Sequence, residues 1–188
     1  MHTARVATGL AAAGFSVIYI CSDLIELAQG GFSTTQLVLT YLGEAAIPLF
    51  VLALYAVQRP AIGALGLWGA LAYAYAYIYF AGTVVYALAA HPADWTVLND
   101  RLGPWVTVHG AVMVVAGICL GLAVARAGVL PPWTGYTLAA GVVLVAATST
   151  APDLARTAAA LVRAAAFIAM GVALLRDAPG KPRREATA

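Results

Sequence analysis

The sequence predicts an all-α, polytopic membrane protein, and two observations carry this prediction. Hydrophobic residues make up 63% of the 188 residues, whereas only 10% are charged. The apolar residues also gather in runs close to the roughly 20 residues that a helix needs to cross a bilayer, and such runs recur along the whole chain. A soluble domain of this length would carry far more charge on its surface. We therefore expect a bundle of about six transmembrane helices.

Six apolar runs predict a single transmembrane domain over residues 1–178, followed by a short basic tail, residues 179–188, that we expect to be disordered. The first run is interpreted as a retained span, because a cleavable signal would rarely carry Asp23 and Glu26 and five more runs follow. The third run is longer than a membrane requires, and the fifth is short. The predicted helices cover residues 5–29, 35–57, 61–90, 104–126, 133–150 and 154–176.

Basic residues near the helix ends predict the orientation. Arg5, Arg59, Arg126 and the basic tail fall on one face of the predicted bundle, while Arg101 and Arg156 fall on the other. This pattern predicts a multi-pass protein of a bacterial plasma (inner) membrane with both termini in the cytoplasm. Membrane lipid is the expected partner of the chain, and the tail is too short to suggest nucleic-acid binding. The connection of residues 91–103 lies on the outer face, where it could cover a cavity.

Acidic side chains interrupt the first two apolar runs. Asp23 and Glu26 are three residues apart in the first run, and Glu44 lies in the second. Charges at such positions are costly in lipid and usually functional. Pro48 lacks the N–H that would bond to the carbonyl of Glu44, so we expect the helix to bend there and leave a free acceptor beside the carboxyl. Glu44 is therefore the preferred candidate for a proton donor.

Three further polar residues accompany these acids. Tyr19 shares a helical stripe with Asp23 and Glu26, and Arg163 is the deepest cation in the last predicted helix. We expect at least one acid to pair with Arg163. His109, in the fourth run, is a candidate partner for the acid, although a lone histidine of this kind is more often a core residue with satisfied hydrogen bonds.

The helix predicted over residues 61–90 is rich in aromatic residues, whose hydroxyl groups need hydrogen-bond partners in a membrane. Helical spacing divides them into two stripes. The first contains Trp68, Tyr75, Tyr79 and Tyr86, and the second contains Tyr73, Tyr77 and Phe80. We expect the first stripe to line a cavity, although interhelical packing explains these residues about equally well.

Short motifs argue against metal and cofactor chemistry. The sequence contains no His-x-x-His, Glu-x-x-His or Cys-x-x-Cys motif, and the three histidines are scattered. The predicted spans carry no lysine for a retinal Schiff base, and a Gly-rich phosphate loop is missing. We therefore expect neither a metal nor a cofactor.

The chemistry that suits these residues is proton donation to an alkene. A carboxyl group in a low-dielectric medium favours its protonated form, and aromatic faces stabilise a developing cation. In size, architecture and intramembrane acids beside aromatics, the chain resembles the small integral-membrane terpene cyclases of meroterpenoid and indole-sesquiterpenoid pathways. The resemblance implies acid-initiated cyclisation of a hydrophobic, isoprenoid-like substrate.

From the residues themselves, Glu44 or Asp23 is the expected acid, and Glu26 or His109 is its partner. Their predicted depths place the cavity in the outer half of the membrane. The expected substrate-binding residues are Tyr19, Trp68, Tyr75, Tyr79, Tyr86 and Arg163.

Two other classes of protein fit the same residues. In a proton-coupled transporter or a small-molecule binding protein, the acids would carry protons instead of donating them to a substrate. In a structural or accessory subunit, the ion pairs would only hold the helices in place. A bundle of this size can also assemble into a homo-oligomer.

Overall fold

The described part of the chain is almost entirely helical. The structure is a computed structural model that describes residues 2–176; the predicted basic tail lies outside the described residues, as do residues 1, 177 and 178 of the predicted domain. The helices are α1 (His2–Gln29), α2 (Thr34–Val57), α3 (Gly63–Ala90), α4 (Trp95–Leu102), α5 (Pro104–Ala127), α6 (Pro132–Ala147) and α7 (Asp153–Arg176). This confirms the predicted all-α fold class.

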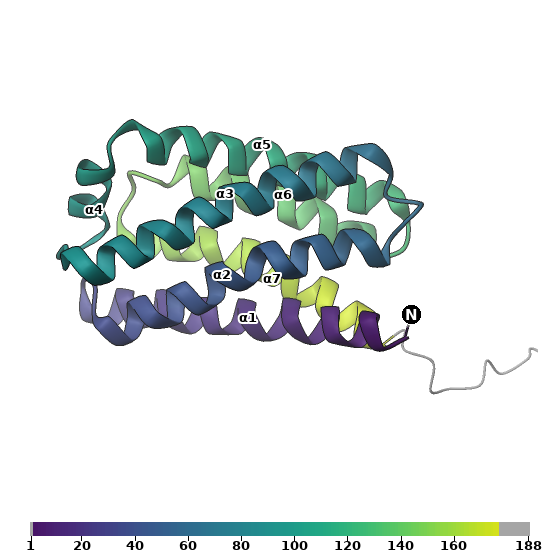
Figure 1. Ribbon diagram of the computed structural model, residues 1–188, viewed down its shortest axis with the longest axis horizontal. Coiled ribbons are helices and arrows are strands. Elements are labelled where there is room, and N and C mark those ends of the chain that lie inside the picture. Colours follow the sequence, from purple (N-terminus) through teal and green to yellow (C-terminus); the bar gives the residue numbers. More distant parts are fainter. Residues whose placement is uncertain (1, 177–188) are drawn as a thin grey trace, which may run out of the picture.

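The helices other than α4 form one bundle of six, in which successive helices run in opposite directions (Figure 1). Each helix packs against two neighbours, in the order α1, α2, α3, α5, α6, α7 and back to α1. Helix α1 begins and α7 ends at the same end of the bundle, which we name the terminal end, whereas α4 lies at the opposite end, the α4 end. The limits of these six helices agree with the predicted ranges to within three residues.

Five of the helices are long and apolar enough to cross a membrane. Helix α6 has 16 residues, which corresponds to about 24 Å at 1.5 Å per residue and falls short of the roughly 30 Å of a hydrocarbon core. The structure thus supports a multi-pass membrane protein with five candidate spans and one shorter apolar helix.

The connection of residues 91–103, predicted as a loop, contains the short helix α4. Asp94 caps this helix, since its Oδ1 accepts a hydrogen bond from the N–H of Val97 at 2.9 Å. Leu98 is buried against Leu37 of α2 and Val84 of α3. Helix α4 therefore covers the ends of α2 and α3 as a packed element.

Aromatic rings fill the centre of the bundle. Phe50 of α2 and Phe167 of α7 meet edge to face with ring centroids 5.1 Å apart, and Tyr73 of α3 lies 6.0 Å from Phe167. Further toward the terminal end, the buried residues Leu54 and Met170 continue this packing. Between the aromatic rings and the terminal end, the middle of the bundle is therefore packed with apolar side chains.

Candidate functional site

The Glu44 carboxyl group lies inside the bundle, on α2, and the residue is only 7% exposed. Its Oε1 accepts a hydrogen bond from the hydroxyl of Tyr19 on α1 at 3.5 Å. Its Oε2 is buried and has no hydrogen-bond partner among the described residues. Since buried polar atoms are nearly always paired, this oxygen is a place where a proton or a small donor can bind.

Arg163 of α7 is buried beside Glu44 but does not pair with it. Its guanidinium group donates a hydrogen bond to the hydroxyl of Tyr77, and its central carbon lies 4.9 Å from the centre of the Tyr19 ring. No carboxylate of residues 2–176 lies within 4.0 Å of Arg163. The predicted direct contact between Arg163 and an acid is therefore wrong. A guanidinium group can also stack on an aromatic face, and Arg163 does so on the ring of Tyr19 instead of pairing with a carboxylate.

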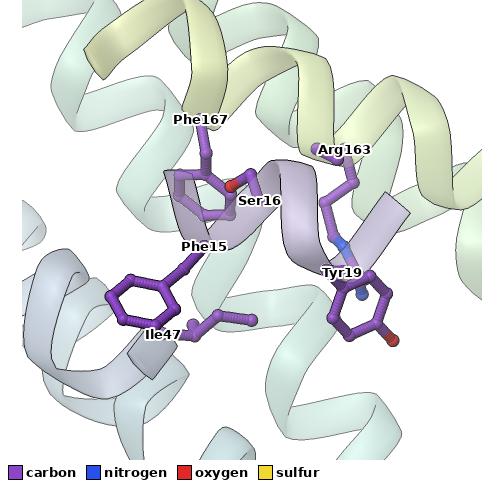
Figure 2. A pocket seen from close by; sticks show the side chains of 7 residues that line it. Phe15, Ser16, Tyr19, Ile47, Arg163 and Phe167 are labelled. Atoms are coloured by element: carbon purple, nitrogen blue, oxygen red, sulfur yellow. The ribbon is translucent and has the colours of Figure 1, made fainter. Parts of the chain in front are cut away.

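Tyr19, Glu44, Tyr77 and Arg163 form what we name the central cluster. A cavity of about 10 Å³ adjoins it, bordered by Phe15, Ser16 and Ile47 together with Tyr19, Arg163, Ala164 and Phe167 (Figure 2). This space is about the size of one water molecule. In this conformation, the cavity beside Tyr19 and Arg163 admits a water-sized species but no polyene.

Two glycines bring the helices close enough to form the central cluster. A β-carbon at Gly43 would lie 3.0 Å from Cδ2 of Tyr19, and one at Gly141 would lie 2.7 Å from Cα of Arg163. Because neither position carries a side chain, α1 packs closely on α2, and α6 packs closely on α7. The local sequence thereby holds Tyr19 beside Glu44 and fixes the backbone of Arg163.

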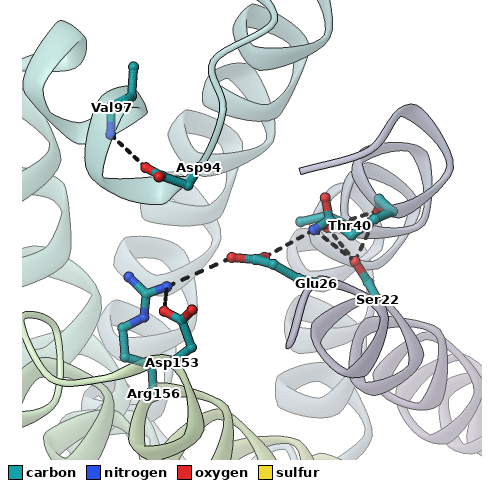
Figure 3. A network of polar contacts seen from close by, with 8 residues as sticks. Ser22, Glu26, Thr40, Asp94, Val97, Asp153 and Arg156 are labelled. Carbon is teal, nitrogen blue, oxygen red and sulfur yellow. Dashed lines mark hydrogen bonds and ion pairs between the residues drawn. The ribbon is translucent and has the colours of Figure 1, made fainter. Parts of the chain in front are cut away.

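A second polar group, the α4-end network, joins α1, α2 and α7 (Figure 3). The side-chain amide nitrogen of Gln36, Nε2, lies 3.1 Å from Oε2 of Glu26 and 2.9 Å from Oγ1 of Thr40. Arg156 lies 3.8 Å from Oε1 of Glu26 and 2.7 Å from Asp153. Its members are Ser22, Glu26, Gln36, Thr40, Asp153 and Arg156.

The α4-end network and the central cluster follow one another along the interface of α1 and α2. Thr40 is one helical turn before Glu44 on α2, and Ser22 is three residues after Tyr19 on α1. Asp23 lies at the same level, half-buried, and has no hydrogen-bond or ion-pair partner in the described part of the chain. Polar side chains therefore extend from the α4 end to the middle of the bundle.

The structure separates the two aromatic stripes of α3. Tyr73 and Tyr77, from the second stripe, are 0% and 1% exposed and face the interior. From the first stripe, Trp68, Tyr75 and Tyr86 are 68%, 57% and 41% exposed on the outside of the bundle. The stripe that was expected to line a cavity beside the acids is thus directed away from Glu44. Helix α3 is apolar on all sides, so its sequence does not indicate which face is buried.

His109 is also separate from the acids and lies between α3 and α5. Its Nδ1 is 2.8 Å from the carbonyl oxygen of Trp105, and its Nε2 is 3.2 Å from the hydroxyl of Tyr75. Its ring stacks on that of Tyr79, with centroids 3.7 Å apart. Both nitrogens have partners, as in a core histidine with satisfied hydrogen bonds. Within residues 2–176, His109 makes no contact with Glu44.

Sequence reasoning missed Ser22, Gln36 and Thr40 as members of a polar site. A signal was present, because Gln36, Thr40 and Glu44 recur every four residues and therefore share one face of α2. The described residues contain no group of three or more His, Cys, Asp or Glu residues that could hold a metal ion.

The geometry is therefore that of a carboxyl group at the end of a polar path inside a membrane bundle. Comparison with protein-family models, with curated proteins and with solved structures found no match for this chain.

Proposed function

We propose that this chain is a proton-coupled membrane protein in which Glu44 takes up and releases a proton. The observation that carries the proposal is the surroundings of the buried Glu44 carboxyl group. Its Oε1 accepts a hydrogen bond from Tyr19, whereas its Oε2 has no hydrogen-bond partner among the described residues. A buried carboxylate without a contacting cation is costly, and a proton on the free oxygen removes that cost. Loss of the proton restores a negative charge that balances the buried guanidinium group of Arg163.

The arrangement of polar groups supports access from one end. The α4-end network leads toward Glu44, while Phe50, Phe167 and Leu54 fill the interior on the other side. If α6 also crosses the membrane, as the six apolar runs predict, the distribution of basic residues places the α4 end outside. Protons then enter from the outside, and transport requires a second conformation that opens the terminal end.

Infrared spectroscopy of the protein in liposomes tests this proposal. A pH step should change the C=O stretching band of a protonated carboxyl group, and Glu44→Gln should remove that change. Asp100→Asn, on an exposed position of α4, is the matched control and should retain it. A pH-sensitive dye inside the liposomes should also report proton movement that Glu44→Gln abolishes.

Two results would contradict proton coupling. The first is an unchanged carboxyl band in Glu44→Gln. The second is a set of variants, Glu44→Gln, Asp23→Asn and Arg163→Met, that lower only the thermal stability. That second result would favour the structural or accessory subunit.

Acid-initiated cyclisation of an isoprenoid is the second candidate function. Its support is the same carboxyl group together with the aromatic rings of Tyr19, Tyr77 and Phe167, which suit a developing cation. It requires the cavity of about 10 Å³ to open. The test is incubation of the purified protein with prenylated polyenes: product formation that depends on Glu44 supports cyclisation, and its absence opposes it.

A further inference from the structure

A groove on the outside of the bundle runs between α3 and α5. Its volume is about 450 Å³, which falls within the range of roughly 300–1,000 Å³ found for small-molecule sites. The groove is apolar, and its lining includes Leu65, Trp68, Ala72, Val112 and Val115. We name it the lateral groove. Because α3 and α5 are candidate membrane spans, a molecule that enters it comes from the lipid.

The pair of Tyr75 and His109 lies next to the lateral groove. Tyr75 is three residues beyond Ala72 on α3, and His109 is three residues before Val112 on α5. The pair therefore stands about one helical turn further along the same two helices. Tyr75 is 57% exposed, so its side chain lies on the outside of the bundle.

The hydrogen bonds of His109 determine whether the Tyr75 hydroxyl can donate or accept a further hydrogen bond. The carbonyl of Trp105 can only accept, so Nδ1 of His109, at 2.8 Å, carries the hydrogen. In the neutral ring Nε2 then accepts, and the Tyr75 hydroxyl at 3.2 Å donates to it. The donor of Tyr75 is thereby used, and its oxygen still has lone pairs for a donor from outside.

We propose that the lateral groove binds a lipid-soluble alcohol whose hydroxyl group donates a hydrogen bond to Oη of Tyr75. A hydrocarbon chain gains little when it exchanges lipid for an apolar groove, because both surroundings are apolar. Selectivity must therefore come from the polar end, where a hydrogen bond is strong in a medium of low dielectric. An alkane offers no such bond, and an ether oxygen accepts but cannot donate.

This site is separate from the central cluster and does not depend on proton exchange at Glu44. Three photoreactive probes test it in phosphatidylcholine liposomes that contain the full chain. The probes are a diazirine-bearing hexadecanol, its methyl ether and the matching hydrocarbon, and mass spectrometry locates the labelled residues. The alcohol should label the lateral groove about three- to tenfold more than the ether or the hydrocarbon, which is the ratio expected for one hydrogen bond.

Variants separate the groove from its polar end. Tyr75→Phe keeps the exposed ring and should reduce labelling by the alcohol to the level of the ether. Ala111→Phe should fill the groove and reduce labelling by all three probes, whereas Ala165→Phe, at an exposed position of α7, is the matched control. Equal labelling by the three probes would overturn the proposal, as would full labelling of Tyr75→Phe. Labelling spread evenly over lipid-facing residues such as Leu49 would show general lipid contact and would also overturn it.

Discussion

Gly141 of α6 lies directly against the backbone of Arg163 in α7. A β-carbon at position 141 would stand 2.7 Å from Cα and 2.8 Å from the amide nitrogen of Arg163. Helix α6 therefore packs directly against the backbone of α7 at Arg163. The guanidinium group of Arg163 contacts Tyr19 and Tyr77 inside the bundle. The buried cation of the central cluster depends on a position without a side chain.

Gly141→Ala should therefore destabilise the protein. The added methyl group meets backbone atoms that cannot rotate away, and such overpacking costs about 1–3 kcal/mol. Thermal unfolding in detergent, followed by near-ultraviolet circular dichroism, measures the change. Gly82→Ala is the control, because a β-carbon there meets nothing within 4 Å. Equal unfolding midpoints for the two variants would contradict the close packing of α6 on α7.

Tyr19→Phe should leave the ring beside Arg163 while removing the hydroxyl that donates to Glu44. The lost hydrogen bond should lower the free energy of unfolding by about 0.5–1.5 kcal/mol. The carboxyl C=O band of Glu44 should also move to higher frequency, because its hydrogen bond is gone. The reference is Tyr136→Phe, at an exposed position of α6. An unshifted band in Tyr19→Phe would show that the contact of 3.5 Å is not a functional hydrogen bond.

Glu44 and Arg163 should be energetically coupled although they do not touch. Glu44→Gln removes the negative charge, Arg163→Met removes the positive one, and the double variant removes both. The cost of the double variant should differ from the sum of the single costs by about 0.5–3 kcal/mol, as for residues in one network. Chemical unfolding of the four proteins measures this difference. Strict additivity would mean that Tyr19 insulates the two charges from each other.

In the α4-end network, the amide of Gln36 should matter more for stability than the ion pair of Arg156. The side chains of Arg156 and Glu26 are 23% and 25% exposed and 3.8 Å apart, so Arg156→Gln should cost less than about 1 kcal/mol. Gln36→Leu removes the buried side-chain amide that donates to Glu26, Thr40 and Ser22 and should cost about 1–3 kcal/mol. Thermal unfolding of the two variants, side by side, tests this order, and the reverse order would refute it.

Asp94→Ala should loosen α4 without unfolding the bundle. The side chain of Asp94 accepts from the N–H of Val97, and loss of such an N-cap costs about 0.5–2 kcal/mol. Hydrogen exchange of residues 95–102 should become faster, while exchange in α5 stays unchanged. Asp94→Asn can still cap the helix and should behave like the parent chain. Faster exchange throughout the bundle would mean that α4 is required for the whole fold.

The long helices were predictable because each is a long apolar run, and membrane helices need little more than that. Helix α4 was not recognised because it has only eight residues and carries no such run. Its sequence signal was local: Asp94 stands at the N-cap, and the apolar Leu98 lies one turn into the helix.

The site was predictable in part. Glu44 and Arg163 are costly in lipid, and this cost correctly indicated that they lie inside the bundle. Their contacts were not predictable, because spacing along a single helix does not say which side chain of another helix lies opposite. Tyr77 takes the contact with Arg163 that had been expected for an acid. The choice between the two stripes of α3 failed for a related reason, since every face of that helix is apolar.

The short apolar helix α6 has a consequence for the surrounding bilayer. If α6 crosses the membrane, its length of about 24 Å produces a hydrophobic mismatch of several ångströms. The lipid must thin locally beside α6, at a cost of fractions of a kcal/mol for each ångström. Two copies that place their short helices side by side share one thinned region of lipid. The mismatch thus provides a physical reason for this chain to associate through α6 and to prefer thin membranes.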